Sequence, residues 1–170
     1  MADKKISELL EADPLDGTED LPIVKDGSTV RCSTQDIADL TLKHVKVSLT
    51  SAEILALNTT PKSIVAAPGA GKVIRVLSAV MRLNFVTQAY TSNVVSAIQY
   101  SGTSTNIISN SVIGASETTI SEQLASTSVS YTPATSDPAN KAIVLKATAG
   151  DPTTGDCTLD VYLSYWVIQL

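Results

Sequence analysis

The stretch APGAGKVIRVLSAV, which begins at Ala67, joins a glycine-rich turn to a lysine, a combination that could hold a phosphate group. A phosphate-binding loop requires Gly, four residues, Gly, Lys and then Ser or Thr. Ala66 stands where the first glycine should be, and Val73 stands where the hydroxyl residue should be. The loop must also lead into a helix, whose first N–H groups hold the anion. Residues 73–86 are instead rich in β-branched side chains, so we interpret the segment as a turn into a strand.

Two further sets of residues invite a chemical interpretation. His44 is the single histidine, and its neighbours in the sequence supply neither a nucleophile nor an orienting acid. Asp151, Asp156 and Asp160 suggest a calcium loop, but the segment lacks the terminal Glu of such loops. We interpret His44 as a surface residue and the three aspartates as parts of a hairpin loop, with an ion site shared between chains as the alternative. We therefore predict no catalytic residue, no cofactor and no metal site, in a protein that is not an enzyme.

Charge is distributed unevenly along the 170 residues, whose net charge is −5. Residues 1–44 hold ten acidic and five basic side chains, whereas residues 45–170 hold seven of each. This split predicts two units with different roles. The acidic balance argues against a nucleic-acid partner, and no apolar stretch is long enough to cross a membrane. Only 17% of the residues are charged, which is low for a soluble monomer and favours a surface partly covered by other chains.

The sequence of the first unit, residues 1–44, predicts a small attachment segment. Ile6, Leu9 and Leu10 have helical spacing, and Asp13-Pro14 ends any helix there. The run LPIVKDGSTVRCS predicts a β-hairpin with its tight turn at Asp26-Gly27, and residues 33–40 predict a short helix. The unit holds too few large apolar residues for a core of its own, so we expect it to pack on a partner, on other copies or on the body.

The body, residues 45–170, predicts an all-β fold. Many short strands are separated by turns rich in Gly, Pro, Asn and Asp, with no long helices between them, which indicates a β-sandwich or a jelly-roll-like body. Thr50 and Glu53 predict a capping box at one short helix. In the long strand after Lys72, strict alternation places Val73, Arg75 and Leu77 on the face that also carries Ala79, Met81 and Leu83. Cys32 and Cys157 form no CxxC motif, so we favour two reduced thiols over one disulfide.

The last strand of the body is apolar on both faces. Leu159, Val161, Leu163, Tyr165 and Val167 share one face, and the other carries the residues that we predict as an oligomer interface: Tyr162, Trp166, Ile168 and Leu170. A rim strand of a monomer should have one polar face. Because burying one large side chain contributes roughly 1.5–3 kcal/mol, we expect this strand to be central in its sheet or covered by a neighbouring subunit.

The first unit also resembles an N-terminal segment of tailed-bacteriophage structural proteins, especially fibres and head decorations. The shared features are Lys5-Ile6-Ser7, Leu9, Gly17-Thr18-Glu19, Leu21-Pro22-Ile23-Val24, Gly27 and a Ser or Thr before Gln35-Asp36-Ile37. The stretches 49–85 and 159–170 resemble a compact β domain of similar virion proteins. Together these stretches span the chain from residue 5 to residue 170.

The resemblance implies a homotrimer that is assembled in the host cytoplasm and becomes part of the virion. Residues 1–44 would attach it to the capsid or to another virion protein, and residues 45–170 would trimerise and project outward. The attachment residues implied in this way are Ile6, Leu9, Leu10, Leu15, Leu21, Pro22, Val24, Asp26 and Gly27. The chain has no fibre shaft, which favours a head fibre or capsid decoration protein over a tail adaptor or short tail fibre. The alternative from another class is a carbohydrate-binding module for host glycans that uses loop tyrosines such as Tyr90 and Tyr131.

Overall fold

The computed structural model describes residues 19–34, 37, 41–125 and 137–170. The chain divides into two compact units, Met1–Thr41 and Leu42–Leu170, and each is described by itself. Four of the predicted attachment residues, Ile6, Leu9, Leu10 and Leu15, lie outside the described residues, and so does Tyr131. Of the predicted helix over residues 33–40, Thr34 and Ile37 are described and helical.

The first unit contains a two-stranded antiparallel hairpin, as the sequence predicts. Strand β1 (Asp20–Lys25) pairs with β2 (Ser28–Ser33), and Lys25 stands opposite Ser28. The two residues between the strands, Asp26 and Gly27, have φ angles of 52° and 79°. Two consecutive positive φ angles define the mirror-image turn whose twist matches that of the flanking strands, which explains the Asp-Gly pair.

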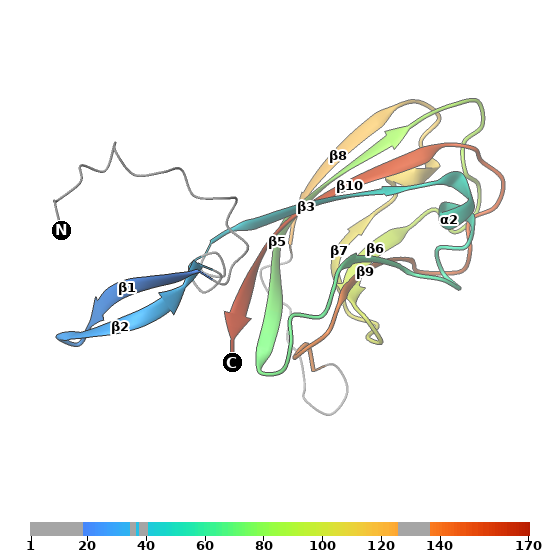
Figure 1. Ribbon diagram of the computed structural model, residues 1–170. Helices are drawn as coiled ribbons and strands as arrows, with labels where there is room; N and C mark the ends of the chain where they lie inside the picture. The colour runs from blue at the N-terminus through green and yellow to red at the C-terminus, as the bar shows by residue number, and fades with distance from the viewer. Residues whose placement is uncertain (1–18, 35–36, 38–40, 126–136) are drawn as a thin grey trace, which may run out of the picture. The chain divides into compact units, whose positions relative to one another are not determined.

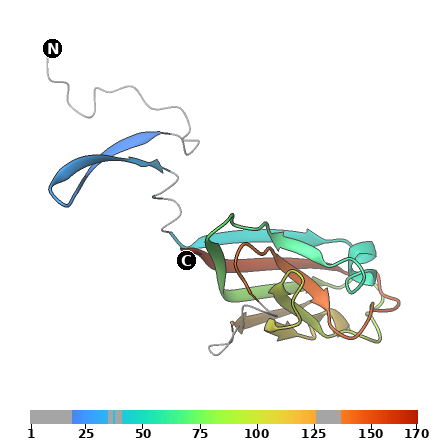
Figure 2. The same ribbon diagram turned by 90° about the horizontal axis from the view of Figure 1, so that it is seen from below.

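In the described part of the body, eight strands form two four-stranded antiparallel sheets that pack face to face (Figures 1 and 2). The first sheet has the order β3 (Lys43–Leu49), β10 (Thr158–Gln169), β5 (Lys72–Asn84) and β8 (Thr119–Leu124). The second has the order β4 (Lys62–Val65), β9 (Ile143–Ala147), β6 (Ser96–Tyr100) and β7 (Asn106–Asn110). Helix α2 (Ser51–Leu55) and the 3-10 turn η2 (Val112–Gly114) lie in the connections. The predicted capping box is present on α2, between Thr50 and Glu53.

The pairing of these eight strands is that of a jelly roll. The first strand of the body pairs with the last, β3 with β10, and the second with the seventh, β4 with β9. The third pairs with the sixth, β5 with β8, and the fourth with the fifth, β6 with β7. A chain that folds back on itself and then winds into two sheets produces this order. The prediction of a β-sandwich or jelly-roll-like body is confirmed.

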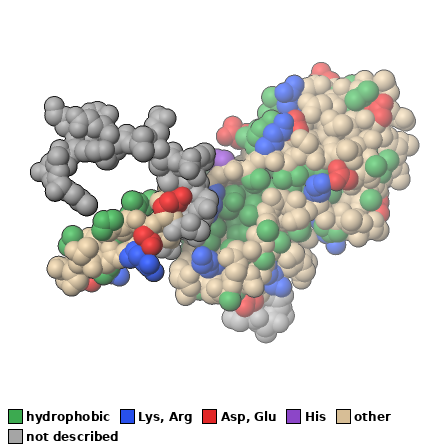
Figure 3. Space-filling model, viewed as in Figure 1, with side chains coloured by type: hydrophobic (Ala, Val, Ile, Leu, Met, Phe, Trp, Pro, Cys, Tyr) green, Lys and Arg blue, Asp and Glu red, His purple; other side chains and the backbone are tan. Residues whose placement is uncertain are grey.

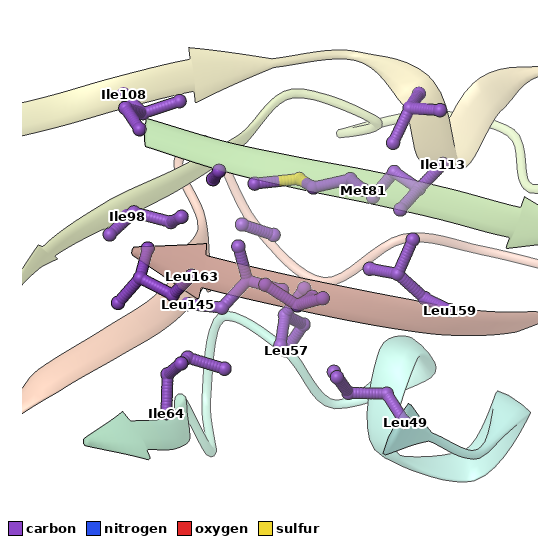
Figure 4. Packing of buried hydrophobic residues seen from close by; sticks show 14 of the residues in the cluster. Leu49, Leu57, Ile64, Met81, Ile98, Ile108, Ile113, Leu145, Leu159 and Leu163 are labelled. Atoms are coloured by element: carbon purple, nitrogen blue, oxygen red, sulfur yellow. The ribbon is translucent and has the colours of Figure 1, made fainter. Parts of the chain in front are cut away.

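The core lies between the two sheets. Figure 4 shows Leu159 and Leu163 of β10 and Met81 of β5 among Ile98 of β6 and Leu145 of β9. All five side chains are buried. At roughly 1.5–3 kcal/mol for each fully buried large side chain, this layer supplies the main favourable term in the stability of the body.

One sequence prediction fails in the long strand β5. Ile74 and Val76 point into the core together with Ala79, and Leu77 does not share the core face. The pairing with β10 shifts at this point, because Ser164 stands opposite Ser78 while Tyr165 stands opposite Val76. Leu77 is therefore the extra residue of a β-bulge, and one inserted residue exchanges the two faces of the strand.

We predict that Gly155→Ala destabilises the body more than Gly69→Ala. Both glycines have positive φ angles, 88° and 100°, so both substitutions strain the backbone. A Cβ at Gly155 would lie 2.5 Å from the buried ring of Tyr90, whereas no described atom lies within 4 Å of a Cβ at Gly69. Overpacking of this kind costs about 1–3 kcal/mol, and urea unfolding of the two variants measures the difference. Equal losses would show that the Tyr90 ring moves aside without cost.

Candidate functional site

The glycine-rich turn before β5 leads into a strand, as predicted. Gly69 and Gly71 both have positive φ angles, and the N–H of Lys72 donates to the carbonyl oxygen of Gly69 at 3.3 Å. The N–H groups that follow belong to the β5 ladder and not to the first turn of a helix, which is where a phosphate loop holds its anion.

The three aspartates of the calcium hypothesis hold different parts of the body. Asp151 accepts from the backbone N–H groups of Asn58 and Thr59 at 2.6 and 3.0 Å. Asp156 accepts from those of Thr87 and Gln88 at 3.0 and 2.9 Å. Asp160 accepts from the hydroxyl of Ser48, which lowers the pKa of this carboxyl, and it forms an ion pair of 3.4 Å with Lys46. Among the described residues, no three His, Cys, Asp or Glu side chains come together in a way that could hold a metal ion.

His44 lies on the outer face of the first sheet. It belongs to β3, it is exposed, and its Nδ1 lies 2.9 Å from the Oγ of Ser164 on β10. The pair lines a hollow of about 250 Å³ whose other described walls include Tyr162, Val80 and Lys46, with no carboxylate among them. A Ser–His pair acts as a nucleophile and base when a third group orients the imidazole, and the described lining supplies no such acid.

The predicted oligomer interface lies on the same outer face. Strand β10 is central in its sheet, so its core face is covered by the second sheet. Its other face remains open: Tyr162, Trp166 and Ile168 are 39, 42 and 37% exposed, and Leu170 is 70% exposed. Figure 3 shows hydrophobic side chains gathered in the middle of the viewed face of the body, with charged side chains around them. The Lys46 ammonium stands 5.3 Å from the centre of the Tyr162 ring.

Strand β8 adds two apolar side chains to this surface that sequence reasoning missed. Ile120 and Leu124 are 66 and 79% exposed, and they stand opposite Arg82 and Ser78 of β5. Alternation within TISEQL places both residues on one face of the strand, but it does not tell which face points outward. We call the set Tyr162, Trp166, Ile168, Leu170, Ile120 and Leu124 the outer β10 face.

The hairpin of the first unit has one apolar face and one mixed face. Residues that stand opposite each other in an antiparallel pair share a face. Leu21 stands opposite Cys32, and Ile23 stands opposite Val30; we call these four residues the hairpin face. Pro22 and Val24, also predicted as attachment residues, lie on the other side with the Asp20–Arg31 ion pair of 3.0 Å. Leu21, Ile23 and Val30 are about two-fifths exposed within the single chain.

The proposed sugar-stacking role of Tyr90 is wrong. Tyr90 is 2% exposed, and its hydroxyl donates to the carbonyl oxygen of Cys157 at 2.7 Å. Burial raises the pKa of this tyrosine to about 12.

Cys157 is itself buried, Cys32 is partly buried in β2, and both are free thiols. In the described parts of the chain, no helix is long and apolar enough to cross a membrane.

No protein-family model matches the sequence, and no curated protein matches it. Among solved structures, the chain is similar to a chain of the cyanophage Pam1 capsid asymmetric unit, with 16% sequence identity and a TM-score of 0.44. The match covers 98% of this chain and 99% of that chain.

We predict that Asp156→Asn lowers the free energy of unfolding at neutral pH and that this loss shrinks in acid. Hydrogen bonds from the Thr87 hydroxyl and from the backbone N–H groups of Gln88 and Thr87 lower the pKa of Asp156 from 3.8 to about 2. A carboxyl whose pKa is lower in the folded state stabilises the fold above its unfolded pKa, and this contribution disappears as the pH falls from about 4 towards 2.

Urea unfolding of both proteins at about pH 7, 4 and 2.5 measures this effect. Glu117→Gln, which removes an exposed carboxylate elsewhere in the body, is the matched control. A difference between wild type and Asp156→Asn that stays constant over the whole range would contradict the assignment of Asp156 as a loop anchor.

Proposed function

We propose that this protein is a structural component of a tailed-phage particle, a trimeric head fibre or capsid decoration protein. Residues 1–44 attach it to the particle, and residues 45–170 trimerise and project. The observation that carries the proposal is the pair of exposed apolar surfaces, the hairpin face and the outer β10 face, in a chain with few charged residues. The resemblance of residues 5–37 to virion attachment segments supplies the class of particle.

The hairpin face supports the attachment role. A two-stranded hairpin is at best marginally stable in water by itself, and this one leaves Leu21, Ile23 and Val30 accessible. An exposed face with several apolar side chains is stabilised when another protein covers it. The opposite side is mixed, because the exposed Val24 lies there with the Asp20–Arg31 ion pair, so we assign the binding role to the hairpin face.

The outer β10 face supports the trimer. Aromatic side chains such as Tyr162 and Trp166 are enriched in the centres of protein interfaces, where they bury large areas and retain a polar group for hydrogen bonding. The flanking Ile120 and Leu124 widen the apolar surface towards the free edge of the sheet, because β8 is the last strand of its sheet. A neighbouring copy that covers this face would also protect that edge.

We predict that Ile23→Asp prevents the chain from joining particles, whereas Thr29→Asp does not. The two substitutions add the same charge to the same hairpin, but Ile23 lies on the hairpin face and Thr29 lies on the opposite side. Phage produced in cells that supply each variant is purified on a density gradient, and immunogold electron microscopy locates the chain on head or tail. Equal incorporation of both variants would refute attachment through the hairpin face, and labelling confined to the tail would refute the head location.

We predict that Trp166→Glu converts the trimer to a monomer, whereas Val86→Glu leaves it intact. Trp166 is part of the outer β10 face, and Val86 is a similarly exposed hydrophobic residue on a loop of the body. Light scattering of the full chain should give three times the 17.8 kDa chain mass for wild type and Val86→Glu, and the single mass for Trp166→Glu. A wild-type protein that is monomeric at high concentration would refute the trimer.

A further inference from the structure

The second sheet carries a hollow on its outer face that neither attachment nor trimerisation uses. Its volume is about 460 Å³. It lies over β6 and β9, and the turn between β6 and β7 contributes Ser101, Thr103 and Ser104 to its lining. Gln99 of β6 and Lys146 of β9 complete its polar groups.

Gln99 distinguishes this hollow from an ordinary surface depression. The side chain is only 6% exposed. Its neighbours Ile98 and Tyr100 belong to the core, so Gln99 points to the outer side of the sheet. Within the part of the chain that the structure describes, the Gln99 amide makes no hydrogen bond. Every fully buried side-chain N or O atom among these residues has a hydrogen-bond partner, so the amide atoms of Gln99 are not fully buried. The amide therefore keeps access to the hollow, where a bound group could satisfy its donor and acceptor together.

Two lysines give the hollow a positive charge. Lys146 stands opposite Ala97, two residues from Gln99 on the same face. The Nζ of Lys141 lies 3.8 Å from the position that a Cβ would take on Gly102, in the turn at the rim. Neither lysine forms an ion pair with a described residue. Within the described part of the chain, both charges are available to a ligand.

We propose that this hollow binds a carboxylated sugar, such as one uronic acid residue of an acidic polysaccharide. The lysines match a carboxylate, because charge-assisted hydrogen bonds to an ionised acceptor are stronger than neutral ones. The amide of Gln99 and the hydroxyls of Ser101 and Ser104 both donate and accept, as sugar hydroxyls do. An inorganic anion would satisfy the donors alone and would leave the Gln99 carbonyl oxygen without a partner.

The test measures binding of a short oligogalacturonate to the full chain by isothermal titration calorimetry, with a neutral galactose oligomer and inorganic phosphate as comparison ligands. Oligogalacturonate should bind saturably, and both comparison ligands should bind at least about tenfold more weakly. Lys146→Gln should weaken binding of oligogalacturonate by about tenfold, whereas Lys25→Gln, in the hairpin of the other unit, should leave it unchanged. Gln99→Glu keeps the size of the side chain, adds a repelling charge and should abolish binding.

Three results would overturn the proposal: no saturable binding of oligogalacturonate, equal affinity in Lys146→Gln and Lys25→Gln, or phosphate binding as tight as that of oligogalacturonate. Circular dichroism checks that each variant is folded. If Gln99→Glu does not fold, Lys146→Gln still tests the sugar site, because Lys146 lies outside the core and its replacement should leave the fold intact. Particle attachment and chain mass are separate measurements, so failure of the sugar site leaves the proposed virion role standing.

Discussion

The burial of one face of strand β10 is the interaction on which the rest of the body depends. Leu159, Val161 and Leu163 are almost completely buried. The strand pairs with β5 from Thr158 to Gln169, and its first part, Leu159–Tyr165, also pairs with β3 on the other side. In a jelly roll, the first strand of the body pairs with the last, so the core closes only when the end of the chain is in place. Contacts between residues so far apart in sequence are costly to form in chain entropy, and the large apolar area under β10 offsets that cost.

The same alternation that fills the core with one face of β10 presents the other face to the outside. Tyr162 lies between Lys46 of β3 and Val80 of β5, and Trp166 stands opposite Arg75 of β5. The hollow with Gln99 and Lys146 lies on the outer face of the second sheet. Because the two outer faces point in opposite directions from one core, contact with a neighbouring copy and binding of a ligand would not compete. A particle that displayed many copies would then bind an acidic polysaccharide with increased avidity, a consequence that depends on both proposals.

Two carboxylates in the body hold loops together. Asp151 and Asp156 accept backbone N–H groups from segments more than sixty residues away in the sequence, and they fix the connections that precede β10 against those that follow α2 and β5. Backbone donors in loops otherwise lose their hydrogen bonds when they leave water. The pKa of Asp156, lowered from 3.8 to about 2, reflects this anchoring, which keeps the carboxylate ionised at acidic pH values where an unperturbed aspartate takes up a proton.

The sequence by itself determined the elements whose causes are local. The Asp26-Gly27 turn, the Thr50–Glu53 capping box and the strand after Lys72 follow from backbone preferences and short-range hydrogen bonds. The two apolar faces of the last strand predicted a central place in a sheet or cover from a neighbouring subunit. Tertiary structure decided the bulge at Leu77, the burial of Tyr90, the exposure of Ile120 and Leu124, and the position of Gln99 in a hollow. Each of these depends on which strands become neighbours and in which register. Pairing between distant strands is set by how the whole core packs, and no local pattern in the chain encodes it.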